Sequence, residues 1–89
     1  MATPLPAASP DALVASLEDE AVVLDLVSKR YFQLNVTGSI IWEGIASGDD
    51  RDEVVRRLVD AFEITPEGAS EAIDTFVAEL RSRGLVRDR

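Results

Sequence analysis

The sharpest change of residue pattern in the chain lies just before its midpoint. Residues 31–34 are an aromatic and apolar run typical of a β-strand, and a polar break over residues 35–38 follows directly. Ile41 and Ile45 then lie four residues apart with Trp42 beside them, which gives the apolar stripe of an α-helix. A strand that leads into a helix within so few residues predicts a small mixed domain whose sheet comes before its helices.

Two further strands are predicted upstream. Residues 12–17 and 21–27 are rich in Val, Leu and Ala, and the acidic residues 18–20 form the turn between them. Residues 30–34 complete a three-stranded antiparallel sheet. Asp25 interrupts the apolar run of the second strand, so we expect it on the water-facing side of the sheet. The opposite face of that strand carries Val22, Leu24 and Leu26.

Three helices are predicted after the sheet. The first covers residues 37–46. Asp50, with Glu53 three residues later, has the spacing of a capping box for the second helix. The third begins at residues 65–67, where a threonine cap, a proline and a glutamate follow one another, and Gly84 closes it. The apolar face of the third helix consists of Ala69, Ala72, Ile73, Phe76, Val77 and Leu80.

The length of 89 residues allows one domain with a single modest core. Three prolines within residues 1–10 predict a loose N-terminal arm, and residues 11–89 are the expected domain. The predicted class is α+β, a three-stranded antiparallel sheet followed by three helices, which are the parts of a winged helix-turn-helix domain.

No apolar run is long enough to cross a bilayer, and the start lacks a secretory signal pattern. A cytoplasmic location is therefore expected.

The composition restricts the possible functions. The chain contains no cysteine and no histidine, which removes thiolate chemistry, the commonest general base and the commonest metal ligand. The acidic cluster at residues 49–53 lacks the glycine and glutamate spacing of a calcium loop, so we interpret it as solvated helix caps. A net charge of −8 disfavours binding to nucleic acid and to anionic membranes. We therefore expect no enzyme, no metal and no cofactor.

An ordered set of motifs gives a more specific indication. An aromatic strand is followed by Leu34-Asn35, then Thr37-Gly38, then Ile41-Trp42, and the third helix ends in the Leu-x-x-x-Gly-Leu-Val pattern of residues 80–86. This arrangement resembles the PqqD-like family, the small domains that recognise leader peptides in ribosomal peptide biosynthesis. The resemblance covers residues 21–86. It implies a winged helix-turn-helix fold and a peptide-binding function without catalysis.

Residues 30–34 are also the predicted peptide-binding strand. They follow a hairpin and lead straight into a helix, so we expect them at a sheet edge whose free backbone groups can pair with a peptide. The resemblance implies that a precursor leader adds a strand there and lies against the third helix. The implied contact residues are Arg30, Tyr31, Phe32, Gln33 and Leu34 on the strand, with Ala69, Ala72, Ile73, Phe76, Glu79, Leu80 and Arg83 on the helix.

Several functions remain open at this point. The chain is most similar to the discrete B1 leader-binding proteins of lasso-peptide gene clusters, which implies delivery of the leader to a separate B2-type peptidase and an association with the cyclase. The alternative is a PqqD-type chaperone that delivers its peptide to a radical SAM enzyme in pyrroloquinoline quinone or another peptide pathway. A winged-helix DNA-binding regulator is disfavoured because acids predominate in the third helix. A dimerisation module whose edge strand pairs with itself is a further alternative.

Overall fold

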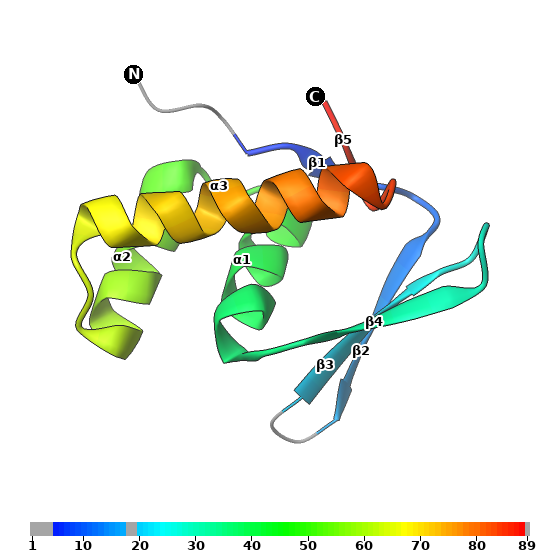
Figure 1. The fold of residues 1–89 in the computed structure, drawn as a ribbon, viewed down its shortest axis with the longest axis horizontal. Coiled ribbons are helices and arrows are strands. Elements are labelled where there is room, and N and C mark those ends of the chain that lie inside the picture. The colour runs from blue at the N-terminus through cyan, green and yellow to red at the C-terminus, as the bar shows by residue number, and fades with distance from the viewer. Residues whose placement is uncertain (1–4, 18–19, 89) are drawn as a thin grey trace.

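The computed structural model describes residues 5–17 and 20–88. Its strands form a three-stranded antiparallel sheet of order β2-β3-β4 and a separate two-stranded ribbon of β1 and β5 (Figure 1). The three helices pack together to one side of the larger sheet. None of the helices in the described part of the chain is long and apolar enough to cross a membrane. The elements are β1 (Ala7–Ala8), β2 (Ala12–Leu17), β3 (Glu20–Asp25), β4 (Arg30–Leu34), α1 (Val36–Ser47), α2 (Arg51–Phe62), α3 (Pro66–Ser82) and β5 (Val86–Arg87).

This architecture confirms the predicted α+β class. The strands over residues 12–17 and 30–34 have the predicted bounds, and β3 ends at Asp25, two residues earlier than expected. Asp25 ends it because its carboxylate accepts hydrogen bonds from the Val27 backbone N–H at 2.9 Å and the Ser28 hydroxyl at 2.9 Å. These two bonds, the Val27 bond foremost, lower the pKa of Asp25 below its ordinary value. Lys29 completes the turn with a left-handed φ of 63°.

The face of β3 that packs against the helices is the opposite of the one predicted. Val23 is fully buried and Ala21 nearly so, whereas Leu24 and Leu26 are each 37% exposed. Alternation alone defines two apolar faces on this strand, and the larger side chains were expected inside. Helix α1 contacts the other face, so the smaller pair became core. Asp25 lies on the same face of β3 as Ala21 and Val23. It is only half-buried, because its carboxylate points toward the hairpin turn.

Helices α2 and α3 begin at the predicted caps Asp50 and Thr65, whereas α1 begins at a cap, Asn35, that was not predicted. The side chains of Asn35, Asp50 and Thr65 each accept the N–H three residues later, at 2.7, 2.9 and 3.0 Å. Gly48 and Gly84 take left-handed conformations at the ends of α1 and α3. Helix α1 is one residue longer at each end than predicted, because its cap lies at the first residue of the polar break.

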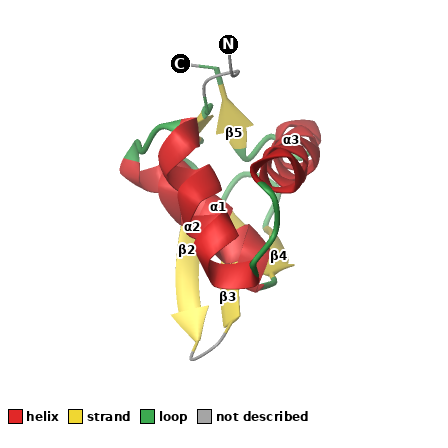
Figure 2. Ribbon diagram, turned by 90° about the vertical axis from the view of Figure 1, so that its left-hand side faces the viewer, coloured by secondary structure: helices red, strands yellow, loops and turns green. Residues whose placement is uncertain are grey.

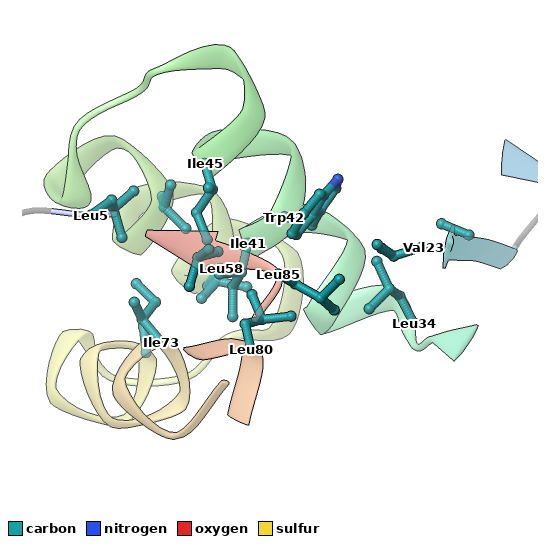
Figure 3. Packing of buried hydrophobic residues seen from close by; sticks show 14 residues of the cluster. Leu5, Val23, Leu34, Ile41, Trp42, Ile45, Leu58, Ile73, Leu80 and Leu85 are labelled. Carbon is teal, nitrogen blue, oxygen red and sulfur yellow. The ribbon is translucent and has the colours of Figure 1, made fainter. Parts of the chain in front are cut away.

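A single core connects all the layers (Figure 3). Ile41 of α1 lies near its centre, beside Leu58, and Ile41 and Ile45 are both almost fully buried. Helix α1 crosses α2 closely: a Cβ at Gly44 would lie only 2.4 Å from Val54 Cγ2, so this contact requires glycine. The other buried members are Leu5, Ala21, Val23, Leu34, Trp42, Val54, Leu58, Ala69, Ile73, Leu80, Leu85 and Val86.

The N-terminal segment differs from the loose arm that was expected. Leu5 is buried in the core, and the Ser9 N–H donates to the Leu85 carbonyl at 2.9 Å. Ala7 and Ala8 form β1, which pairs antiparallel with β5. Residues 5–9 therefore form part of the folded unit, because the core offers Leu5 a site that the local sequence does not reveal. Residues 1–4 lie outside the described part of the chain.

Arg51 ties α2 to α3. Its guanidinium is buried, and Nη2 donates to the Ser70 carbonyl at 3.0 Å, to the Ser70 hydroxyl at 2.8 Å and to the Asp74 carboxylate at 2.6 Å. Asp49 pairs with Arg57 at 2.9 Å, which accounts for part of the acidic cluster. The Arg51 hydrogen bonds therefore join α2 directly to α3.

A candidate peptide-binding groove between β4 and α3

Strand β4 is an edge strand, as predicted. It pairs only with β3 among the strands of the described residues, so one side of its backbone is open. In both Figure 1 and Figure 2 it lies beneath α3, which runs alongside it. Cross-strand pairing of Val23 with Phe32 and of Ala21 with Leu34 turns Phe32 and Leu34 to the helical side. Tyr31 is 72% exposed on the outer face.

Two adjoining hollows run along this edge. The first, of about 380 Å³, lies between β4 and α3, and the second, of about 470 Å³, lies between the start of α1 and the middle of α3. They share Asn35, Phe76 and Glu79, so we treat them as one feature, the β4–α3 groove. The first hollow is lined by Tyr31, Phe32, Gln33, Leu34, Asn35, Phe76, Glu79, Leu80 and Arg83. The second is lined by Asn35, Thr37, Gly38, Ile41, Glu71, Ala72, Thr75, Phe76 and Glu79.

Phe76 forms the middle of the groove and depends on a glycine. A Cβ at Gly38 would lie 3.0 Å from Cε1 of the Phe76 ring and 3.2 Å from the Asn35 side-chain oxygen. Both distances are shorter than ordinary van der Waals contact. Glycine at this position therefore lets the ring lie directly on the first turn of α1, where it separates the two hollows.

A charged bridge crosses one end of the groove. The Arg83 guanidinium lies over the Phe32 ring, 4.3 Å from its centroid, and donates to the Glu79 carboxylate at 3.1 Å. This arrangement joins α3 to β4 through a cation–π contact and an ion pair. Glu71 stands at the other end, where the second hollow contains no basic lining residue. The rim therefore has both charges at the Arg83 end and negative charge alone at the Glu71 end.

Most of the residues expected at the strand and helix meet in this groove. Three do not: Ala69 and Ile73 are fully buried, and Arg30 is exposed at the start of β4 without lining either hollow. The apolar stripe of α3 is broad, and its innermost part packs into the core. The expected residues that line the groove are Tyr31, Phe32, Gln33, Leu34, Ala72, Phe76, Glu79, Leu80 and Arg83.

The sequence-based set lacked the part of the groove formed by α1. The first turn of α1 contributes lining residues because the Asn35 cap brings it against α3. The Asn-x-Thr-Gly motif was the available signal, since a cap and a glycine at fixed spacing mark a helix start that another element approaches. The additional lining residues are Asn35, Thr37, Gly38, Ile41, Glu71 and Thr75.

The groove has features that suit the binding of a peptide. It combines an open strand edge, an aromatic and aliphatic floor and a charged rim. No group of three or more potential metal-ligating side chains occurs within residues 5–17 and 20–88. An extended peptide fits these features, because the strand edge pairs with its backbone and the floor takes alternate side chains.

Comparisons with known proteins agree with this geometry. The model of the family described as coenzyme PQQ synthesis protein D (PqqD) matches residues 20–86 of this chain. One similar solved structure is TbiB1 in complex with the TbiA(beta) leader peptide, which is 24% identical, has a TM-score of 0.86, and covers 93% of this chain and 96% of that one. Another is a lasso peptide synthetase B1 complexed with the leader peptide, at 28% identity and a TM-score of 0.82, covering 90% and 94%.

No curated protein sequence matches this chain significantly. The match to the family model extends over three quarters of the chain and includes β3, β4 and all three helices. The elements that form the β4–α3 groove lie entirely inside the matched region. The chain therefore belongs to the PqqD family.

Proposed function

We propose that this protein is a non-catalytic adaptor that binds the leader segment of a ribosomally made precursor peptide. The observation that carries the proposal is the open edge of β4 directly beside the apolar groove under α3. Both structural relatives described above are complexes with a leader peptide. The adaptor would act in the cytoplasm, where precursor peptides are made, and present the leader to a separate leader peptidase of a lasso-peptide pathway.

The mode of binding follows from the strand edge. A leader strand hydrogen-bonds to the free side of β4, which gives affinity with little dependence on sequence. Successive leader side chains alternate in direction, so every second one enters the groove near Phe32 and Phe76. The groove therefore selects leaders with bulky apolar residues two positions apart. The Arg83–Glu79 pair sits at the end of the groove, where it favours polar leader residues.

The energetics favour reversible binding. Burial of roughly 400 Å² of apolar surface contributes about 10 kcal/mol at ~25 cal/mol/Å². Ordering a disordered leader costs about 2–5 kcal/mol, and association itself costs more. Backbone pairing offsets part of that cost, so we expect dissociation constants in the micromolar range. Such an affinity lets the adaptor hold the precursor and raise its concentration at the processing enzyme, yet release the leader after cleavage.

Fluorescence anisotropy of a labelled leader, taken from the precursor peptide encoded beside this protein, tests the proposal. We expect saturable binding that Phe76→Ala weakens by about tenfold, because a buried aromatic contact of this kind contributes at least ~1.4 kcal/mol. Phe62→Ala is the matched control: Phe62 is a phenylalanine at the end of α2 that lines neither hollow. Equal affinity in both variants would exclude the β4–α3 groove as the binding site, and no binding to the folded protein would exclude this function.

The match to the PqqD family model supports a second candidate, a peptide chaperone for a radical SAM enzyme. Both candidates require leader binding, so anisotropy alone does not separate them. Sedimentation of the leader-loaded protein with each candidate enzyme distinguishes the two functions. A complex with a leader peptidase supports the lasso-type role, and a complex with a radical SAM enzyme supports the second.

A further inference from the structure

The sheet has a second open edge. β2 is its other outer strand, and one side of its backbone pairs with no strand in the described part of the chain. Leu13 and Val14, on opposite faces of β2, are both about half exposed. The strand contains no charged residue and no proline, which are common means of protecting an edge against pairing. This edge is therefore open to a strand from another molecule.

A hollow lies beside this edge, between the sheet and α1. It has a volume of about 250 Å³, with Val14 and Ala21 on the sheet side and Trp42 and Ala46 on the helix side. We call it the β2–α1 groove. It shares only Leu34 with the β4–α3 groove, so the two lie against opposite edges of the same sheet.

Trp42, which lines this groove, has an indole N–H donor without an acceptor in the described part of the chain. Its side chain is 3% exposed, and Nε1 has no acceptor among the described residues. Figure 3 shows the nitrogen-bearing edge of the ring pointing away from Ile41 and Leu85 in the core. A buried indole N–H without an acceptor costs free energy. A backbone carbonyl oxygen of a strand bound in the groove would supply such an acceptor.

The charges around the groove select the occupant. Neither residues 1–28 nor α1 contain a lysine or an arginine. Glu43 lines the groove, and Asp11 directly precedes β2. A second copy of this chain would bring the same acids to the edge and repel the first. A basic partner gains from them.

We propose that the β2–α1 groove binds an extended segment of a partner protein that is apolar in its centre and carries lysine or arginine at its ends. The segment pairs with β2 as an added strand. One of its apolar side chains lies between Val14 and Ala46, and a carbonyl oxygen accepts the Trp42 N–H. The proposal does not depend on leader binding, and occupation of both edges at once would place a peptide and a partner on one sheet.

A library of random ten-residue peptides, selected on the 89-residue protein, tests the proposal. We expect the selected peptides to have apolar centres with basic ends, and Val14→Glu to weaken their binding by about tenfold or more, because it places a charge in an apolar groove. Val27→Glu is the matched control, since Val27 is 73% exposed in the hairpin and lines neither groove. Ala46→Glu tests the opposite wall, and thermal unfolding shows that each variant is folded.

Trp42 gives a direct readout because it is the only tryptophan of the chain. Peptides without tryptophan should shift its indole N–H resonance downfield and protect it from hydrogen exchange. The proposal is overturned by selected peptides with acidic ends, by equal binding to Val14→Glu, or by failure of the selection. Binding lost in Phe76→Ala but not in Val14→Glu would place the peptides in the other groove. Self-association lost in Val14→Glu would make a second copy the occupant.

Discussion

Substitution of Gly38 by alanine separates the stability of the fold from the shape of the β4–α3 groove. The new Cβ would lie 3.0 Å from Phe76 Cε1, so the half-buried ring must retreat by a few tenths of an ångström. Alanine in a helix is favoured over glycine by up to about 1 kcal/mol, and a mild steric clash offsets a similar amount. We therefore expect the free energy of unfolding to change by less than about 1 kcal/mol.

Leader binding should respond much more strongly than stability. Displacement of the ring that separates the two hollows changes the shape of both, and we expect the dissociation constant to rise by about threefold to tenfold, or ~0.7–1.4 kcal/mol. Gly68→Ala is the matched control. Gly68 occupies the same position of α3, three residues after its cap, and its nearest neighbour is the Thr65 hydroxyl rather than the groove.

The assay pairs urea unfolding with leader anisotropy for Gly38→Ala, Gly68→Ala, Phe76→Leu and the double variant Gly38→Ala/Phe76→Leu. The shorter leucine should remove the clash, so Gly38→Ala should cost little additional affinity in that background. The proposed role of the ring would be refuted if Gly38→Ala weakened leader binding equally in the wild-type protein and in the Phe76→Leu variant. An unchanged dissociation constant in the single Gly38→Ala variant would also refute it.

Three further predictions concern the fold that supports the groove. Arg51→Ala should lower the free energy of unfolding, measured in urea, by about 2 kcal/mol, because it leaves Ser70 and Asp74 without their donor. The control Arg56→Ala, at an exposed residue, should change it by less than about 0.5 kcal/mol. Similar losses in the two variants would contradict the prediction. Leu5→Ala should lower the free energy of unfolding by about 2–3 kcal/mol, because Leu5 is buried in the core, and a neutral effect would contradict this. The pKa of Asp25 is lowered in the fold, so its stabilisation is complete above about pH 3.9 and is lost as pH falls through the lower folded pKa. Asp25→Ala should therefore destabilise the protein more at pH 7 than in strong acid, by thermal unfolding at each pH; an equal effect would contradict this.

The sequence predicted the elements well because their signals are local. Asp50 and Thr65 cap their helices as predicted, because a cap needs only the N–H three residues later. The order of strands and the edge position of β4 followed from short connections, which make consecutive strands neighbours. These features depend on residues close together in the chain.

Features that depend on distant residues were harder to predict. Both faces of β3 are apolar, so only the position of α1 decides that Val23 rather than Leu24 is buried. The apolar residues of α3 have helical spacing, as predicted. Ile73 is buried in the core whereas Phe76 lines the groove, and the position of the neighbouring sheet decides which of the two is covered. Strand β1 is two alanines long, and only its partner β5 near the other end of the chain makes it a strand.

The pairing of β1 with β5 has a consequence for how the domain can be connected to other proteins. Ala7 pairs with Arg87, so the chain enters and leaves the fold at neighbouring points. Both points lie above α3 in Figure 1, whereas β4 lies below it. A host protein can therefore carry this domain as an insertion in a surface loop, with short connections and an unobstructed β4 edge. The same closure makes circular permutation through a short linker compatible with the fold.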